Sequence, residues 1–219
     1  MVADLVERLM SLDVSLLCDA DKALPVVDPG LRAMVADVRM AGPALPVVAD
    51  GDHLPVLSAL AEAEAGDVLV IAAAGCGVAV CGELFAAEAR RRGLAGIVVD
   101  GLCRDLQGLR RGRLPFFARG TSPMAGTAVS RAPAGRPVRC GGVDVARGDL
   151  VFGDDDGIAI APPARFAAAI DAAEGIADSE RAILAALERG GTALRDLTNH
   201  DEHVARLDRG EESRLAFLV

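Results

Sequence analysis

Apolar side chains follow two different periodicities along the chain. Leu5, Leu9 and Leu12 recur at helical spacing, which predicts one or two short helices within residues 1–24. Residues 67–72 and 96–100 are instead nearly continuous apolar runs of strand length, as expected for strands that are covered on both faces. Between them, residues 83–92 return to the helical pattern and end at a glycine. This strand–helix–strand order predicts parallel neighbouring strands.

Further elements are expected on both sides of this unit. Residues 33–48 read as extended structure interrupted at Gly42-Pro43, and residues 53–65 read as a helix that ends at Gly66. Beyond residue 104, the pattern predicts a short helix, several short strands and an Ala-rich helix, at 106–111, 114–118, 125–130, 141–145, 149–153, 157–162 and 163–187. Residues 191–219 are more polar and are expected to form a C-terminal extension, either a partner-facing arm or a partly disordered tail. The predicted division is therefore one α/β domain at 1–190 and an extension at 191–219.

Composition narrows the classes of function. The net charge of −9 argues against a nucleic-acid backbone as the main partner, because phosphate binding requires a basic surface. Lys22 is the only lysine and lies far from the motifs described below, which disfavours Schiff-base chemistry. The five cysteines follow neither a disulfide framework nor the spacing of a zinc site, and we interpret them as reduced, buried thiols. With no secretion signal and no apolar run near 18 residues, about the length that a membrane span needs, we expect a cytoplasmic protein without a membrane partner.

The strongest chemical signal is a pair of turns separated by twenty residues. A glycine-rich loop at residues 75–82 leads into the helix that begins at residue 83. The first amides of this helix, which follow Gly82 and include those of Leu84 and Phe85, are expected to bind an anion. Arg104 follows the next strand and offers two parallel donors to a carboxylate. Because ligands lie beyond the carboxyl ends of parallel strands, the two turns are expected to converge on a small 2-oxo acid.

Carboxylates accompany both turns. Asp105 is expected to ligate Mg²⁺ or Mn²⁺ directly and Glu83 to hold a metal-bound water, since hard cations prefer oxygen ligands. Plainer interpretations remain open: the glycines permit a tight turn, Arg104 forms a surface ion pair, and Asp105 caps the helix that follows it. Asp100 either lines the site or holds a turn with the next glycine.

Two other groups of polar residues are weaker candidates. Asp154 to Gly157 lacks the ligand ladder of a calcium loop and is interpreted as an Asp-rich turn between strands. His200 and His203 are spaced for a shared helix face but have no second ligand pair nearby, which favours solvated polar histidines.

Glu83, twenty intervening residues and then Arg104-Asp105 form a pattern that resembles the RraA-like family, which includes 4-hydroxy-4-methyl-2-oxoglutarate/4-carboxy-4-hydroxy-2-oxoadipate aldolases. The resemblance spans roughly residues 12–190. Supporting segments lie at 18–20, 28–30, 82–84, 96–101, 117–120, 137–143 and 148–157. The family resemblance implies a β/β/α swivelling-domain-like fold, assembled as a homotrimer or a dimer of trimers with sites between subunits.

The same resemblance implies a role for each site residue. Arg104 would grip the pyruvyl group, Asp105 would carry the metal, and Glu83 would order a metal-bound water. The backbone around Gly82, Leu84 and Phe85 would hold the substrate carboxylate. Glu180 is the best match for a catalytic glutamate that a neighbouring subunit contributes from its C-terminal helix.

The function expected from these residues is that of a metal-dependent carbon–carbon lyase. Cleaving a 2-oxo acid beta to its keto carbon leaves a pyruvate enolate, whose charge the metal and Arg104 would stabilise. Gly108 stands where family aldolases carry an acid, which favours oxaloacetate decarboxylation over retro-aldol cleavage. Two alternatives stay open: a non-catalytic, protein-binding regulator of a ribonuclease, and a specialised biosynthetic lyase or isomerase.

Overall fold

The computed structural model describes residues 2–218, which divide by compactness into one unit ending at Ile170 and a second beginning at Asp171. The first unit contains α1 (Val2–Leu9), α2 (Val14–Ala20), β1 (Arg32–Ala33), β2 (Met40–Val48), α3 (Leu54–Glu62), β3 (Val68–Ala72), β4 (Ala79–Cys81), α4 (Glu83–Arg91), β5 (Gly96–Cys103), α5 (Leu106–Gly112), β6 (Phe116–Thr121), β7 (Val138–Cys140), β8 (Val143–Val145), β9 (Leu150–Asp154), β10 (Gly157–Ala161) and the start of α6 (Pro163–Arg189). The second unit contains the rest of α6, the 3₁₀ helix η1 (Leu194–Leu197) and α7 (His200–Asp208). The predicted division after residue 190 coincides with the end of α6, whereas compactness divides the chain within that helix.

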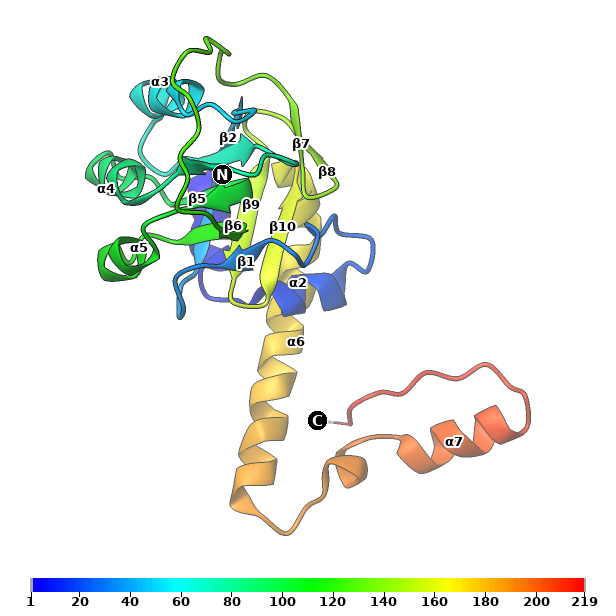
Figure 1. Cartoon of the computed structure of the whole chain (residues 1–219). Coiled ribbons are helices and arrows are strands. Elements are labelled where there is room, and N and C mark those ends of the chain that lie inside the picture. The colour runs from blue at the N-terminus through cyan, green and yellow to red at the C-terminus, as the bar shows by residue number, and fades with distance from the viewer. Residues whose placement is uncertain (1, 219) are drawn as a thin grey trace. The chain divides into compact units, whose positions relative to one another are not determined.

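Eight strands form one mixed sheet in the order β1-β6-β5-β3-β2-β9-β10, with β4 paired to β5 (Figure 1). The central strands β2, β3, β5 and β6 are parallel, and β1, β9 and β10 add antiparallel pairs at the margins. Residues 68–72 lie opposite residues 96–100 in parallel register, and α4 connects the two strands. The predicted α/β class and the predicted parallel pair are therefore confirmed.

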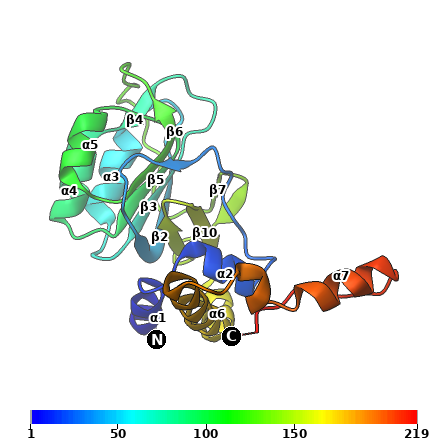
Figure 2. The same ribbon diagram turned by 90° about the horizontal axis from the view of Figure 1, so that it is seen from below.

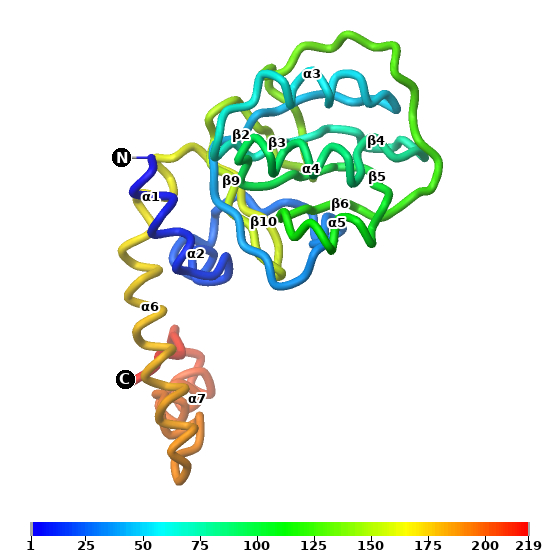
Figure 3. The backbone as a smooth tube through the Cα atoms, turned by 90° about the vertical axis from the view of Figure 1, so that its left-hand side faces the viewer, coloured from blue at the N-terminus to red at the C-terminus, as the bar shows by residue number. Residues whose placement is uncertain are grey.

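Helices α3, α4 and α5 lie side by side over one face of the sheet (Figures 2 and 3). Buried aliphatic side chains such as Val56, Leu60 and Leu109 join these helices to the strands. A second buried cluster fills the other face, where the β7–β8 hairpin and residues such as Val27 and Leu31 pack. Phe116 belongs to the first buried cluster and its neighbour Phe117 to the second, because successive side chains of a strand point to opposite faces of the sheet.

The predicted break at Gly42-Pro43 is wrong, because β2 passes through both residues without interruption. Residues 40–43 pair with β9 and residues 44–48 pair with β3. Pro43, which has no N–H, stands where the strand changes partner, so it removes no donor from the middle of one ladder. Gly42 allows a close approach, since a Cβ there would lie 2.1 Å from the carbonyl oxygen of Gly66.

Four further strand assignments differ from the sequence prediction. Strand β5 continues past Asp100 to Cys103, and the short strand β4 lies within what was expected to be loop. Residues 125–130, all described by the structure, form no strand and contribute only single bridges, at Ala125 and Thr127. Strand β8 pairs with β7 rather than with β9. The first three differences arise from pairing between distant segments, which local periodicity does not report, whereas β7 and β8 form a local hairpin.

The C-terminal extension has regular structure of its own. Asn199 precedes α7 and binds the returning segment, since its Nδ2 donates to the Arg214 carbonyl at 3.1 Å and its Oδ1 accepts from the Ala216 amide at 2.7 Å. Within residues 2–218, no helix combines the length and the apolar character needed to cross a bilayer.

Candidate functional site

The two turns singled out in the sequence meet at the ends of neighbouring parallel strands. Cys81 of β4 lies opposite Cys103 of β5, and the Arg104 amide donates to the Cys81 carbonyl at 3.1 Å. Gly82 therefore lies against Arg104 and Asp105. A Cβ on Gly82 would come within 2.8 Å of Asp105 Oδ2 and 3.0 Å of Arg104 Cγ, so glycine is what permits this approach.

Helix α4 points its N-terminus into the same place. Its first intrahelical bond runs from the Ala86 amide to the Gly82 carbonyl at 3.1 Å, so the amides of Glu83, Leu84 and Phe85 precede the helical ladder. These amides lie at the positive end of the helix dipole. The local geometry therefore suits a carboxylate without requiring a lysine.

The turns and the helix N-terminus line one pocket of about 330 Å³, a volume that includes the open space at its mouth. Its lining residues are His53, Ala79, Val80, Cys81, Gly82, Leu84, Phe85, Arg104, Asp105 and Ala125. Five of the predicted site residues are thus brought together: Gly82, Leu84, Phe85, Arg104 and Asp105. The loop that closes one side is tied down at Ala79, whose amide donates to the Met124 carbonyl at 2.7 Å.

Asp105 precedes α5 but does not cap it with its side chain. Its carboxylate instead lies 3.4 Å from Arg104 Nε, and 40% of the side chain is exposed. The residue has left-handed backbone angles, with φ of 60° and ψ of 40°. Non-glycine residues adopt this conformation at an energetic cost, and such strain clusters at functional sites.

The side chain of Asp105 fits a hard divalent cation that keeps most of its water. Mg²⁺ commonly takes only one or two protein carboxylates and retains several waters. Within residues 2–218, no group of three or more His, Cys, Asp or Glu could bind a metal together. Among the residues that line the pocket, Asp105 has the one carboxylate that could hold such an ion within a single chain.

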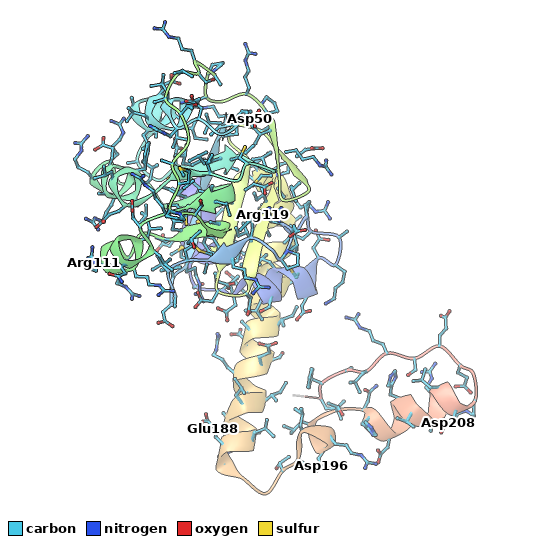
Figure 4. The ribbon with its side chains drawn as sticks, viewed as in Figure 1. Asp50, Arg111, Arg119, Glu188, Asp196 and Asp208 are labelled. Atoms are coloured by element: carbon cyan, nitrogen blue, oxygen red, sulfur yellow. The ribbon has the colours of Figure 1, made fainter. Side chains whose placement is uncertain are left out.

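Glu83 is not brought into this pocket. Its carboxylate lies in a neighbouring hollow between α4 and α5, with Oε1 3.3 Å from Arg111 Nη2. A Cβ on Gly108 would lie 2.0 Å from Glu83 Cδ, so the Glu83 carboxylate occupies the space where a side chain at 108 would begin. Arg111 extends from α5 at the margin of the fold (Figure 4).

Glu180 lies exposed on α6, in the second unit. Its predicted role in the site of a neighbouring subunit lies outside a single chain, so it stays a prediction.

Asp100 does not line the pocket but supports the fold behind it. It is 3% exposed and accepts hydrogen bonds from Arg119 Nε and, at 2.6 Å, from the Gly141 amide. Arg119 also reaches Asp28 at 3.1 Å, and the hydrogen bond to Asp100 raises the pKa of Arg119. Arg119 lies over the sheet in Figure 4. Four of the segments that carry the family resemblance thus meet in one structural ion-pair network.

Three of the five cysteines are buried packing groups, as expected, whereas Cys18 and Cys76 are partly exposed. All five are free, and Cys81, Cys103 and Cys140 are buried. Burial raises the pKa of Cys103 to about 11 and also raises that of Cys81, which lines the pocket, so both thiols stay protonated.

His53 is the pocket residue that the sequence analysis missed. It immediately precedes α3, and its amide donates to the Thr127 carbonyl at 2.9 Å. Its ring lies 6.0 Å from that of Phe85, in an edge-to-face arrangement at 73°. In the sequence, His53 belongs to an Asp–His pair at the start of a predicted helix. Such a pair marks the N-terminus of the helix but does not show which part of the molecule that N-terminus faces.

Asp52 anchors the segment that carries His53. It is 3% exposed and accepts four hydrogen bonds, from the amides of Leu54, Val129 and Ser130 and from the Thr127 hydroxyl, at 2.7 to 3.1 Å. Burial alone would raise the pKa of Asp52, but these hydrogen bonds outweigh it and hold the pKa well below its usual range.

The weaker candidates have structural roles. Asp154 ends β9 and accepts from the Val14 amide at 2.8 Å and from the Asp156 amide at 3.0 Å, as expected for an Asp-rich turn. His203 bonds Ser213 at 2.9 Å and His200 bonds Asp201 at 2.9 Å, so the two histidines have separate polar partners.

Fold and site together define an α/β protein with a pocket at the carboxyl ends of its parallel strands. A sequence model of the RraA-like family, described as Aldolase/RraA, matches residues 14–160. The chain belongs to this family, and the predicted resemblance is confirmed.

Similar proteins are known by sequence and by structure. The chain is 35% identical over 161 residues to a protein of Halalkalibacterium halodurans named "Putative 4-hydroxy-4-methyl-2-oxoglutarate aldolase", covering 73% of this chain and 77% of that one. Streptomyces coelicolor RraAS2, described as an unusual member of the RNase ES inhibitor RraA protein family, superimposes with a TM-score of 0.71 at 29% identity, covering 81% and 94% of the two chains. An uncharacterized protein from Pseudomonas syringae shares the fold with a TM-score of 0.78 at 24% identity, covering 89% and 96%.

Proposed function

We propose that this chain is a divalent-metal-dependent carbon–carbon lyase acting on a small 2-oxo acid through a pyruvate enolate. Its substrates would be 4-hydroxy-4-methyl-2-oxoglutarate-like acids, oxaloacetate or both. The observation that carries the proposal is a single pocket lined by Arg104, Asp105 and the N-terminus of α4. The name of the Halalkalibacterium halodurans relative supports the same chemistry.

Each group in the pocket has a distinct task in this proposal. The amides at Leu84 and Phe85 hold the substrate carboxylate, and the guanidinium of Arg104 orients the pyruvyl group through parallel donors. As negative charge develops on the 2-oxo oxygen, Arg104 stabilises it, which is usually the largest catalytic term. Asp105 would hold Mg²⁺ or Mn²⁺, which supplies Lewis-acid polarisation of the 2-oxo group when bound.

Replacing Arg104 tests the proposal directly. In Arg104→Ala we expect kcat/KM for pyruvate release from oxaloacetate to fall by about 100-fold or more, because one donor to a developing oxyanion is typically worth that much. Arg104→Lys should recover only part of it, since a lysine cannot form the bidentate contact. Arg139→Ala is the matched control, because Arg139 pairs with Asp144 at the surface. Wild-type turnover in Arg104→Ala would refute the assigned role.

Metal dependence has its own test. We expect EDTA to abolish pyruvate release and Mn²⁺ or Mg²⁺ to restore it, and we expect Asp105→Asn to weaken Mn²⁺ binding measured by calorimetry. Asp144→Asn, a change at a side chain that is 83% exposed, should bind Mn²⁺ as the wild type does. Release that persists in EDTA would eliminate the metal from the mechanism.

A second candidate function is protein-binding regulation of a ribonuclease. The similarity to RraAS2 favours it, because that protein is described as a member of an RNase inhibitor family. A regulator would slow RNA cleavage by a ribonuclease of the RNase ES type, and Arg104→Ala would slow it equally. The lyase proposal expects no such effect from either protein.

A further inference from the structure

The pocket contains a polar side chain that the proposed function leaves unused. Of its ten lining residues, Arg104 and Asp105 have assigned roles, and His53 is the remaining titratable group besides the thiol of Cys81. The Cys81 thiol is buried and its pKa is raised, which leaves it protonated. Imidazole is the side chain most often used for proton transfer in enzymes.

The ring of His53 is free to meet a ligand. Within residues 2–218, neither ring nitrogen has a hydrogen-bond partner, and the ring contact is the edge-to-face packing on Phe85. The backbone beneath it is held firmly, because its amide bonds Thr127 and the adjacent Asp52 forms four hydrogen bonds. The held backbone and the packing on Phe85 position the ring, and its ring nitrogens stay available to a ligand in the pocket.

Retro-aldol cleavage also needs a proton acceptor, and the other acids at or beside the pocket within one chain do not supply it. Glu83 points into the neighbouring hollow toward Arg111, and position 108 has no side chain. Asp105 is committed to the cation in the proposed function. Cleavage of a 4-hydroxy-2-oxo acid begins by removing the proton of the 4-hydroxyl group, so the pocket must offer a base for it.

We propose that His53 is a catalytic residue that accepts the proton of the substrate 4-hydroxyl group. A neutral ring nitrogen of His53 takes this proton, the O–H electron pair forms the C4 carbonyl, and the C3–C4 bond breaks. The bond electrons pass to the C2–C3 unit as the pyruvate enolate, stabilised by Arg104. The imidazolium then returns the proton to C3, which releases pyruvate and the second carbonyl product with no external oxidant or reductant. This inference rests on the proposed lyase function.

A comparison of two substrates tests the role of His53 separately from the proposed function. Oxaloacetate loses carbon dioxide to give the same enolate but has no hydroxyl proton to remove, and the open pocket lets water protonate that enolate. The experiment measures pyruvate release from 4-hydroxy-4-methyl-2-oxoglutarate and from oxaloacetate with Mn²⁺. It compares the wild type with His53→Asn, a residue favoured at the starts of helices, and with His53→Phe, which keeps a ring against Phe85.

In both variants we expect kcat for the hydroxy acid to fall by about 100-fold or more, the usual contribution of a general base. Oxaloacetate decarboxylation should stay within about threefold of the wild type, as the assigned proton transfer is not part of that reaction. His203→Asn is the matched control, since His203 bonds Ser213 in the second unit.

Two results would overturn the assignment of His53 alone. Wild-type cleavage of the hydroxy acid by both variants would show that another group accepts the proton. An equal fall for both substrates would reduce His53 to a structural role. A wild-type protein that releases pyruvate from neither substrate would instead refute the proposed function and the role of His53 with it.

Discussion

Gly82 and Gly108 shape the candidate site through the space that they leave open. Gly82 allows the Asp105 carboxylate and the stem of Arg104 to pack directly against the start of α4. Gly108 leaves room for the Glu83 carboxylate, which turns toward Arg111 and away from the pocket. Because residue 108 has no side chain, the Glu83 carboxylate has room to lie beside α5 and outside the pocket.

Alanine at two glycines should have different effects on stability. In Gly108→Ala the new Cβ meets only the flexible end of Glu83, and alanine favours the helix, so we expect the free energy of unfolding to change by less than about 1 kcal/mol. In Gly42→Ala the Cβ would lie 2.1 Å from the Gly66 carbonyl oxygen, and we expect a loss of about 1–3 kcal/mol. Urea unfolding measures both. Equal losses of stability in the two variants would show that a clash with a backbone atom costs no more than a clash with a flexible side chain.

At the scale of elements, the start of α3 and the loop at residues 125–130 act as one piece. Asp52 joins them through hydrogen bonds to Thr127, Val129, Ser130 and Leu54, and this junction supports one side of the pocket. The loop forms no strand, so the buried carboxylate of Asp52 adds to the few backbone bonds that hold it, such as the one from the Thr127 amide to the Gly51 carbonyl.

Replacing Asp52 should make stability depend on pH in a defined direction. The pKa of Asp52 is lowered in the folded state, so its stabilising contribution is complete above the unfolded pKa of about 4 and is lost as the pH falls through the lower folded value. We therefore expect Asp52→Asn to be less stable than the wild type at pH 7 and the difference to shrink below about pH 4.

Urea unfolding of both proteins at a series of pH values checks this expectation. Asp50→Asn is the control, because Asp50 is an exposed neighbour that accepts one bond from Cys76 (Figure 4). A difference between wild type and Asp52→Asn that does not change with pH would contradict an ionised, hydrogen-bonded Asp52.

At the scale of the whole first unit, Arg119 joins segments that are far apart in sequence. It binds Asp28 of the N-terminal region and Asp100 of β5, and Asp100 in turn binds the Gly141 amide of the β7–β8 turn. This network lies on the face of the sheet opposite α3, α4 and α5, where the second buried cluster packs.

Arg119→Met should lower the free energy of unfolding by at least about 2 kcal/mol, because Asp100 would stay buried without its charged partner. Arg139→Met removes a surface pair and should change stability by less than about 0.5 kcal/mol, as surface substitutions usually do. Thermal or urea unfolding distinguishes the two. A loss at Arg119 no larger than at Arg139 would show that the network is not structural.

The class of fold and the meeting of the two turns follow from local pattern. Apolar runs at 67–72 and 96–100, with a helical run between them, specify parallel strands whose carboxyl ends share one edge. Arg104 and Gly82 each end a strand or open a helix, so their approach depends only on this order. The family resemblance rests on the same residues.

Contacts between residues that are distant in sequence decide the other features of the fold and the site. The change of partner in β2, the bonds from Asp52 to residues 127–130, and the turn of Glu83 toward Gly108 and Arg111 all join residues that are distant in sequence. Periodicity records which face of an element is buried, but it does not record which distant group covers that face. For this reason the sequence by itself predicts the meeting of the two turns, while the positions of His53 and of the Glu83 carboxylate are decided only by the folded geometry.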